Sequence, residues 1–497
     1  MTSTAATTVI TLHSAAEYAG LLRAVPEGSI YVDGRYVGAH DRHRVFAKAD
    51  GAFIAEIGYA STGDVNAAVE AADAAFPAWA ARAPSDRSTM LSRLADALER
   101  RSHEFAMLEA HHAGKLITDA ELEIRSGVQT LRWFASCALH IDGRMPAGTP
   151  AQLRYVRREP LGVCSLILPW NFPLLLMLWK LGPALAAGNT VVAKPASETP
   201  LTALAFGLLC DEAGLPHGVY NVVPGSGREA GMALATHDRI AKVSFTGSTS
   251  VGLQVAAAAA RTVKRVTLEL GGKSPNIVCD DADLDRAAAG IAGIFGHAGQ
   301  KCAARTRCFV QESVADRLVE KVAARASALR IGDPLDRAAT LGPVINSEAQ
   351  ETILGYCRSA TEEGARLVCG GKAPVGRRGP YVEPTVFDHA RNDMTFAREE
   401  IFGPVLAVIR IKDIDEAILL ANDSVFGLAA SVWTGSLSKA HTIAARLEAG
   451  SVSVNTPAVI GIETPFGGYK QSGLGRELGV EGLDAYLQHK SVIVDLG

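Results

Sequence analysis

Residues 161–195 of the chain have the sequence LGVCSLILPWNFPLLLMLWKLGPALAAGNTVVAKP. This stretch predicts a β-strand over residues 161–168, a helix over residues 174–187 and a second strand over residues 190–193. Both strands are almost continuously apolar, as is typical of strands that are buried on both faces of a parallel sheet. The stretch therefore predicts the centre of an α/β domain.

The same alternation continues toward the C-terminus. Further strands are expected at residues 219–223 and 241–245, and further helices at residues 202–213, 230–235 and 251–260. Strands that alternate with helices predict a doubly wound open sheet, which binds ligands at the carboxyl ends of its strands. The polar or flexible residues expected at those ends are Asn171, Lys194, Gly225 and Ser248.

A helix start suited to phosphate follows the strand at residues 241–245. The usual G-x-G-x-x-G fingerprint does not follow the first strand, but GSTSVG at residues 247–252 offers small residues at a helix N-terminus. An ordinary Ser/Thr helix cap is the alternative interpretation.

Two further regions flank this sheet. Before it, an Asp33-Gly34 pair between short strands predicts a hairpin, and helices are expected at residues 65–80, 85–113 and 115–135. After Gly272, strands at residues 276–278 and 308–311 alternate with helices at 283–295 and 314–329, which predicts a second α/β domain. The tail strand at residues 491–495 has no partner nearby in sequence, so we expect it to join another sheet edge, including one in another subunit.

Composition limits the functional class. The chain has 497 residues, 48% of them hydrophobic, which suits two or three domains. The net charge is −4 without a basic block, so nucleic acid is not an expected partner. The eight cysteines form no C-x-x-C pair, which argues against a metal site or a disulfide framework. Residues 1–10 lack the features of a secretory signal and residues 161–187 are too interrupted to span a membrane, so we expect a cytoplasmic protein.

A thiol and a carboxylate stand out as candidate catalytic groups. Cys302 lies on a small-residue turn between an expected helix and an expected strand, where its side chain can face a cleft. Glu269 interrupts an apolar strand just before Gly271-Gly272, and such partial burial raises the pKa of a carboxyl group and prepares it as a general base. Each residue alone also fits a structural role. Together they suggest covalent catalysis followed by hydrolysis.

Seven motifs resemble those of the aldehyde dehydrogenase superfamily, in the same order and over nearly the whole chain. They are PWNFP at 169–173, VAKP at 192–195, FTGST at 245–249, LELGG at 268–272, GQKC at 299–302, EEIFGP at 399–404 and PFGGYK at 465–470. The resemblance implies a Rossmann-like nucleotide-binding domain, a catalytic domain and a small β oligomerisation arm in a homodimer or homotetramer. These parts correspond to residues 1–137 with 161–268, residues 269–465, and residues 138–160 with 480–497.

The resemblance also implies the chemical roles. The Cys302 thiolate would attack an aldehyde carbonyl, and the Asn171 amide with the Cys302 backbone N–H would form the oxyanion hole. Glu269 would activate water to hydrolyse the thioester. Lys180 resembles the family's proton-relay lysine, with a plain surface lysine as the alternative.

Cofactor binding is implied at a further set of residues. Glu400 would bind the nicotinamide ribose, Phe402 would hold the ring, and Lys194 would reach the adenine ribose. The residues expected along the cofactor are Trp170, Gly225 and Ser248. Many NAD-specific members carry Glu three positions after the lysine, but this chain has Ser197 there, so we expect NADP to be used alongside NAD.

The substrate is expected to be an apolar medium-chain or aromatic aldehyde. Trp179, Phe295 and the loop residues Val459, Ile460 and Ile462 are largely apolar and are expected to line its tunnel. No Arg pair for a carboxylate tail is evident. Betaine-type or amino aldehydes are the first alternative, because a tryptophan can face a cation; succinate-semialdehyde-type and CoA-acylating activity are the others.

A cation adjoins the expected nucleophile. Lys301 occupies a position that varies within the family, so the polarity of the pocket is left open by the sequence.

Overall fold

The apolar strands around residue 165 form the centre of an eight-stranded mixed sheet. A computed structural model describes residues 17–458 and 460–497 of the chain. The strand order is β2 (Arg35–Gly38), β1 (Ser29–Val32), β8 (Tyr220–Val222), β7 (Thr190–Lys194), β6 (Val163–Ile167), β9 (Ile240–Thr246), β10 (Arg265–Glu269) and β20 (Gly473–Leu474). The five strands from β8 to β10 are parallel, and β1 and β20 add antiparallel edges.

Side chains of the central strands alternate between two apolar cores. Cys164 and Leu166 of β6 face one core, whereas Val163 and Ile167 face the other, as the twofold period of a strand requires. The helices of the first core are α3 (Pro84–Arg100), α4 (Ser102–Ala113), α5 (Ile117–Ala138), α6 (Pro173–Ala187) and α7 (Leu201–Ala213). Those of the second are α2 (Thr62–Ala80), α8 (Met232–Thr236) and α9 (Thr249–Ala260). The predicted double winding is therefore confirmed.

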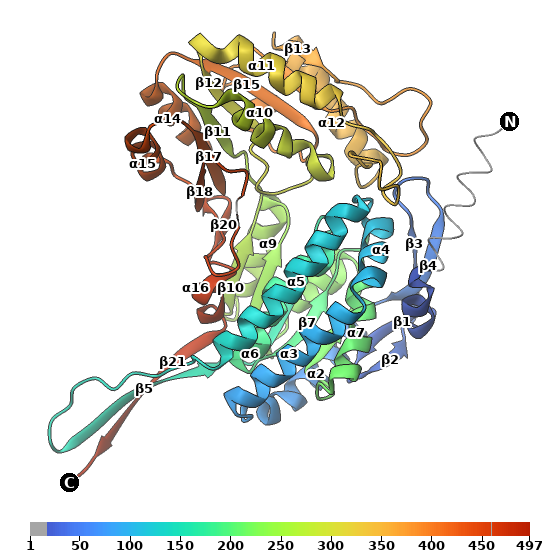
Figure 1. The fold of residues 1–497 in the computed structure, drawn as a ribbon. Helices are drawn as coiled ribbons and strands as arrows, with labels where there is room; N and C mark the ends of the chain where they lie inside the picture. Colours follow the sequence, from blue (N-terminus) through green and yellow to red (C-terminus); the bar gives the residue numbers. More distant parts are fainter. Residues whose placement is uncertain (1–16, 459) are drawn as a thin grey trace.

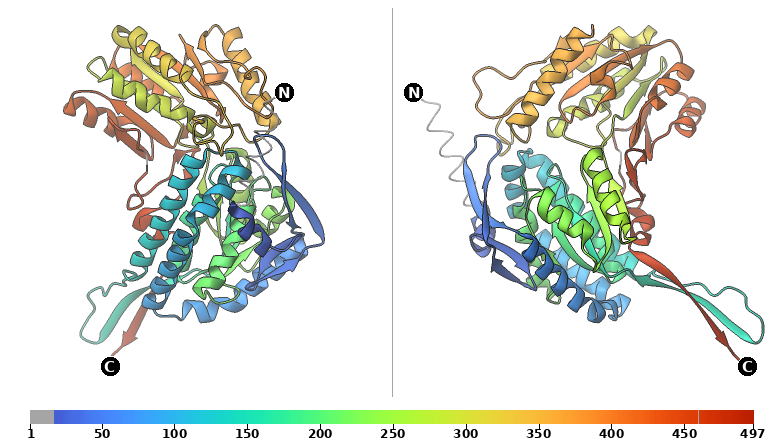
Figure 2. Two further views of the ribbon diagram at one scale, coloured as in Figure 1. Left: turned by 45° about the vertical axis from the view of Figure 1, so that its right-hand side comes forward. Right: turned by 180° about the vertical axis from the view of Figure 1, so that it is seen from behind.

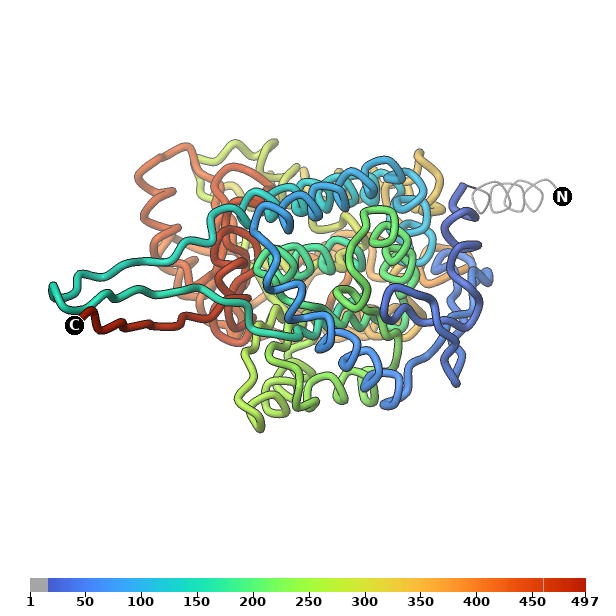
Figure 3. Tube along the Cα trace, turned by 90° about the horizontal axis from the view of Figure 1, so that it is seen from below, coloured from blue at the N-terminus to red at the C-terminus, as the bar shows by residue number. Residues whose placement is uncertain are grey.

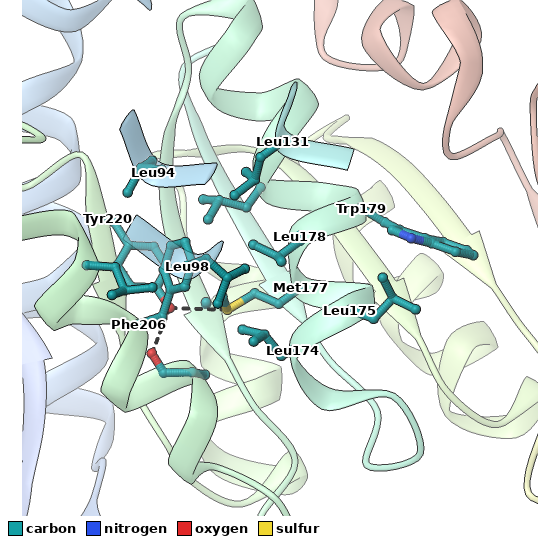
Figure 4. Packing of buried hydrophobic residues seen from close by; sticks show 14 of the residues in the cluster. Leu94, Leu98, Leu131, Leu174, Leu175, Met177, Leu178, Trp179, Phe206 and Tyr220 are labelled. Atoms are coloured by element: carbon teal, nitrogen blue, oxygen red, sulfur yellow. Dashed lines mark hydrogen bonds between the residues drawn. The ribbon is translucent and has the colours of Figure 1, made fainter. Parts of the chain in front are cut away.

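Apart from Lys180, helix α6 is apolar on all sides because it packs in two directions. Met177 and Leu178 face Leu98 of α3 and Leu131 of α5, while Trp179 points away from them (Figure 4). Trp179 instead meets Phe466 edge to face, with ring centroids 5.5 Å apart. One face of α6 thus stabilises the core on one side of the eight-stranded sheet, and the other face is available to a binding site.

A second sheet of seven strands follows. Its order is β13 (Arg366–Cys369), β14 (Thr385–Asp388), β15 (Val405–Ile411), β12 (Arg307–Gln311), β11 (Pro275–Val278), β17 (Ala429–Trp433) and β18 (Ser451–Val454). One face packs on α10 (Leu284–Ala292) and α11 (Glu312–Ser327), and the other packs on α12 (Ser347–Glu362), α14 (Ile414–Asn422) and α15 (Leu437–Arg446). The two α/β bodies meet near the middle of the molecule (Figures 1 and 2). Strand β20 shows that the chain returns to the first sheet after leaving the second.

The C-terminal strand forms an arm with a distant segment of its own chain. Strand β21 (Leu487–Asp495) pairs antiparallel with β5 (Gln152–Pro160) from end to end, and the pair extends away from both bodies (Figures 1 and 3). The expected tail strand is therefore present, but its partner is intramolecular. The arm leaves Ile493 64% exposed.

Two helix predictions are wrong in extent. The helix expected over residues 85–113 is two helices, because Arg101 leaves the helical conformation and binds Glu104 and Glu212. The helix before Cys302 ends at Ala292 and continues as the 3-10 segment η2 (Gly293–Gly299). No helix among the described residues is long and apolar enough to cross a membrane.

Candidate active site

A cavity of about 530 Å³ lies at the carboxyl ends of β6, β7, β9 and β10. It is large enough for a drug-sized or cofactor-sized ligand. The predicted residues that line it are Trp170, Asn171, Lys194, Ser197, Ser248, Cys302, Glu400 and Phe402. The carboxyl edge of the parallel sheet thus gathers residues that are far apart in sequence.

Lys194 supplies a buried ammonium at the end of β7. Its Nζ donates hydrogen bonds to the carbonyls of Pro195, at 2.8 Å, and Gly225, at 3.2 Å. Burial lowers the pKa of Lys194 to about 8. Gly225 lies behind the lysine and does not line the cavity; Gly227 and Gly231 do so instead. A Cβ at Gly225 would lie 2.6 Å from that of Ala230, so the close packing requires glycine.

Ser197 and Glu198 differ sharply in their partners. The Ser197 hydroxyl lies 3.0 Å from the Tyr59 hydroxyl and donates to the Gly225 carbonyl at 3.3 Å. Glu198 is held by an ion pair with Lys48 and accepts from the Asn346 amide at 3.2 Å. Both residues line the cavity, but the carboxylate is already neutralised by its neighbours.

The opposite wall carries Glu400, Phe402 and Trp170. A Glu400 oxygen accepts the Gly272 N–H at 2.9 Å, and burial raises the pKa of Glu400 to about 7. A Cβ at Gly271 would overlap the same carboxylate, which explains the glycine pair. The Trp170 and Phe402 rings meet edge to face at 5.2 Å.

Ser248 begins α9 beside the cavity. It occupies the N-cap position, but its side chain makes no hydrogen bond to the helix backbone. Its Oγ instead lies 3.3 Å from the Ser250 hydroxyl. The ordinary-cap interpretation is therefore wrong, and the first N–H groups of a twelve-residue helix remain available to an anion.

Cys302 stands where two cavities meet. Of the described residues, it alone lines both the cavity above and a second one of about 350 Å³. Its loop is held by Gln300, whose carbonyl accepts from the Asn171 amide at 2.9 Å and whose side-chain oxygen accepts the Ile345 N–H at 2.8 Å. Burial, followed by the negative charges of Glu269 and Glu400, raises the pKa of the Cys302 thiol to about 12.

Glu269 is the last residue of β10, and its side chain is almost fully buried. It is 3% exposed, and neither carboxylate oxygen has a hydrogen-bond partner among the described residues. Burial and the charge of Glu477 raise its pKa well above the usual value. The carboxylate lies beside the two cavities without lining either, and its Oε1 is 2.7 Å from the position of a Cβ at Gly467.

Lys180 is fully buried, so the surface-lysine alternative is wrong. Its Nζ forms an ion pair with Glu477 and donates to the Thr246 hydroxyl at 2.7 Å. Glu477 and Lys180 are also the charges that act most strongly on Glu269. No pattern in the sequence points to Glu477, which is 297 residues from Lys180.

The second cavity lies between α6, η2 and the loop that follows β18. Trp179 and Ile460 line it as expected, together with the apolar residues Phe172, Leu175, Leu176, Ile294, Pro457 and Phe466. Ile462 lines a more open outer cavity that also contacts Trp179. Val459 lies outside the described residues.

Phe295 is not part of this cavity. It is fully buried in the core between α10 and the second sheet, and its neighbour Ile294 faces the cavity instead. The prediction is wrong because Ile294, four residues after Gly290, continues the helix face that lines the cavity, and Phe295 points from it toward the core.

Two cations line the second cavity. Lys301 stands out in the sequence beside Cys302, whereas Arg305 is not among the predicted site residues. The Arg305 guanidinium donates to the Ser453 hydroxyl at 3.0 Å and to the Pro457 carbonyl at 2.6 Å. Its position three residues after Cys302 is the signal that could have identified it.

No cluster of three or more His, Cys, Asp or Glu side chains in the described part of the chain could hold a metal ion.

Comparison with known proteins assigns the family. Residues 36–492 match the model of the aldehyde dehydrogenase family. This chain belongs to the aldehyde dehydrogenase family. It is 45% identical to aldehyde dehydrogenase 1A1 from Gallus gallus over 461 residues, which cover 92% of this chain and 90% of that protein.

Solved structures of similar proteins agree with this assignment. Indole-3-acetaldehyde dehydrogenase AldA from P. syringae, in complex with NAD+ and IAA, is 41% identical with a TM-score of 0.94, covering 97% of this chain and 99% of that one. An NADP-dependent enzyme from E. coli is 38% identical, also with a TM-score of 0.94, over 96% and 99% of the two chains. The chain is thus an oxidoreductase, an aldehyde dehydrogenase.

Proposed function

We propose that this enzyme oxidises an aldehyde to its carboxylic acid with NAD or NADP, through a thioester on Cys302. The observation that carries the proposal is the position of Cys302 at the junction of a larger, cofactor-sized cavity and a smaller second cavity. A nucleophile at such a junction can meet an aldehyde on one side and a hydride acceptor on the other.

The chemistry of the larger cavity fits a nicotinamide dinucleotide. The N-terminus of α9 offers backbone donors for phosphate, and Lys194 offers a buried cation. Glu400 offers an acceptor for ribose hydroxyls, and Phe402 an aromatic surface for a ring. When bound there, the cofactor would supply the hydride acceptor.

Cys302 and Asn171 would perform the first step. Burial raises the pKa of the thiol to about 12, so it is protonated at rest and its proton passes to solvent water as the sulfur attacks the carbonyl. Attack forms a thiohemiacetal whose oxyanion accepts from the Asn171 amide and the Cys302 backbone N–H. One Asn171 N–H already binds the Gln300 carbonyl, which fixes the orientation of the amide and leaves its second N–H for the oxyanion.

Glu269 would perform the second step as a general base toward water. Its carboxylate is buried without a hydrogen-bond partner among the described residues, and this burial raises its pKa and makes it a stronger base toward water. Lys180 and Glu477 form an ion pair whose charges act on Glu269, and they would carry the proton onward. A CoA-acylating enzyme would not need this base.

Absorbance of the reduced cofactor tests the proposal. Mixing the enzyme with an aldehyde and NAD or NADP should give steady turnover that CoA does not accelerate, with the free acid as product. Turnover that depends on CoA would show that the CoA thiol, and not water, accepts the acyl group. The absence of turnover with any aldehyde would overturn the proposal.

The body of the substrate is proposed to be aromatic or medium-chain. Phe172, Trp179 and Phe466 give the second cavity apolar walls. Lys301 and Arg305 also line it and repel positive charge, which argues against the betaine-type and amino aldehydes.

The assembly is proposed to be a homodimer or homotetramer built through the arm. Strand β21 pairs only with β5 among the described residues, which leaves its outer edge open, and Ile493 is exposed on the arm. Residues 1–137 with 161–268 would bind the cofactor, 269–465 would carry catalysis, and 138–160 with 480–497 would form the arm. A cytoplasmic location suits eight cysteines that are all unpaired, including the nucleophile.

A further inference from the structure

We propose that the second cavity selects aldehydes that carry a carboxylate, which Lys301 and Arg305 bind. This inference rests on the proposed aldehyde oxidation and adds the charge of the substrate to it. Both cations line the cavity that contains Cys302, and no Asp or Glu among the described residues lines it. An otherwise apolar pocket with only positive charge is suited to a substrate with an apolar body and an anionic group.

Lys301 has the features of a cation without a partner. Its Nζ makes no hydrogen bond or ion pair with any described residue within the distances that define one, although most of the side chain is enclosed. The ammonium lies against bare backbone, 2.7 Å from the position that a Cβ would take at Gly296. A partly desolvated charge without a partner is unfavourable, so an anion that enters the cavity is stabilised by it.

The carboxylates around Lys301 do not take this role. Burial is the main cause that lowers the pKa of Lys301, and Asp119 and Glu123 oppose this effect through their charges. Neither acid lines the cavity. Glu123 is bound to Lys115, and Lys115 and Arg305 act on Lys301 with the opposite sign. The surroundings therefore leave the positive charge largely uncompensated.

Arg305 adds a second, oriented donor group. Its bonds to Ser453 and Pro457 fix the guanidinium in the wall of the cavity. These bonds use two of the five N–H donors, and the others remain for a ligand. Burial lowers the pKa of Arg305 only to about 10, so it stays charged at neutral pH. Hydrogen bonds from a guanidinium to a carboxylate are stronger than those between neutral groups.

Matched substrates test the inference. Values of kcat/KM are compared for 3- and 4-carboxybenzaldehyde and for the corresponding carbamoylbenzaldehydes, which have almost the same shape without the charge. For the better of the two ring positions, the wild-type enzyme should prefer the carboxylate at least about tenfold, a difference of ~1.4 kcal/mol. A preference of less than twofold, or a preference for the amide, overturns the inference.

Variants of Lys301 and Arg305 test whether these two cations cause the preference for the carboxylate substrate. Lys301→Met and Arg305→Gln should each reduce the ratio about fivefold or more, whereas Lys301→Arg should retain most of it. Because each ratio is taken within one variant, a general loss of turnover cancels. Lys321→Met, which removes the same charge from the surface of α11, is the matched control and should leave the ratio unchanged. Equal ratios in all variants would show that the cations do not act on the substrate.

Binding to Cys302→Ala gives a readout without turnover. Calorimetry should show tighter binding of the carboxylate than of the amide, and the Lys301→Met change should remove this difference. If the carbamoylbenzaldehydes are oxidised but no charge preference appears, only this inference fails. If none of the aldehydes is oxidised, the proposed function fails first.

Discussion

The two cavities that meet at Cys302 are built in different ways. The larger one collects residues from the carboxyl ends of four parallel strands, and their positions follow from the fold. The smaller one is assembled from one face of α6, a 3-10 segment and a loop, none of which has a fixed place in a doubly wound sheet. In the proposed function, cofactor binding would therefore depend on topology, whereas substrate choice would depend on local irregularities.

Removal of the residue shared by both cavities should have the largest effect. Cys302→Ala should reduce kcat/KM by more than about a thousandfold, because no other described side chain lines both cavities. Cofactor and aldehyde binding, measured by calorimetry, should survive. Turnover above about a thousandth of the wild-type value would mean that the nucleophile is another group.

Glu269 should affect the second step alone. Glu269→Gln should release about one equivalent of reduced cofactor per site in a burst and then turn over about a hundredfold more slowly. The base acts when ionised, so wild-type kcat should rise with pH through the raised pKa of Glu269, and the variant should lack this rise. A variant without a burst would assign Glu269 to activation of the thiol instead.

Much of the larger cavity can be predicted from the sequence. Lys194, Asn171 and Ser248 follow strands that are parallel neighbours, so their meeting at one edge follows from the alternation of strands and helices. The position of Cys302 on a turn before β12 is likewise predictable, because small residues separate an expected helix from an expected strand. Sequence order and strand direction are therefore sufficient to bring these groups together.

The remaining features depend on contacts that local sequence does not encode. The pairing of Lys180 with Glu477 and of β21 with β5 joins distant segments, and only the packed fold brings them together. Ile294 rather than Phe295 lines the cavity because it continues the face of α10 that carries Gly290, and local sequence does not show which face of that segment meets the cavity. The position of Arg305 after Cys302 is visible in the sequence, but its orientation is not, because the partners that orient it lie about 150 residues away.

The choice between NAD and NADP tests the larger cavity, and the expected change in kcat/KM is smaller than for the Cys302 and Glu269 variants. We expect NADP to be used with kcat/KM within about tenfold of NAD, a gap of ~1.4 kcal/mol or less, because Lys194 and Ser197 can donate to a 2′-phosphate. Ser197→Glu should reduce kcat/KM for NADP about tenfold or more and leave that for NAD nearly unchanged.

Glu198→Gln is the matched control for this experiment. The ion pair with Lys48 already neutralises Glu198, so the change should alter the ratio of NADP to NAD by less than about threefold. A wild-type preference for NAD above about a hundredfold, or ~2.8 kcal/mol, would contradict the role given to Ser197.

The arm should have the smallest effect on chemistry, because it lines neither cavity. Deletion of residues 491–497 removes about half of β21, which should shift the protein to smaller species in light scattering. When the deletion is combined with Glu269→Gln, the burst of reduced cofactor per site should change less than about twofold. An unchanged mass would show that the arm is not the assembly contact.

The most direct test of thioester catalysis is to trap the acyl group on Cys302. Glu269→Gln is mixed with 4-carbamoylbenzaldehyde and NAD or NADP, quenched in acid and digested for mass spectrometry. We expect the peptide containing Cys302 to gain the mass of the acyl group, at a yield close to that of the burst. An unmodified Cys302 peptide after a full burst, or an acyl group on another residue, would contradict the mechanism.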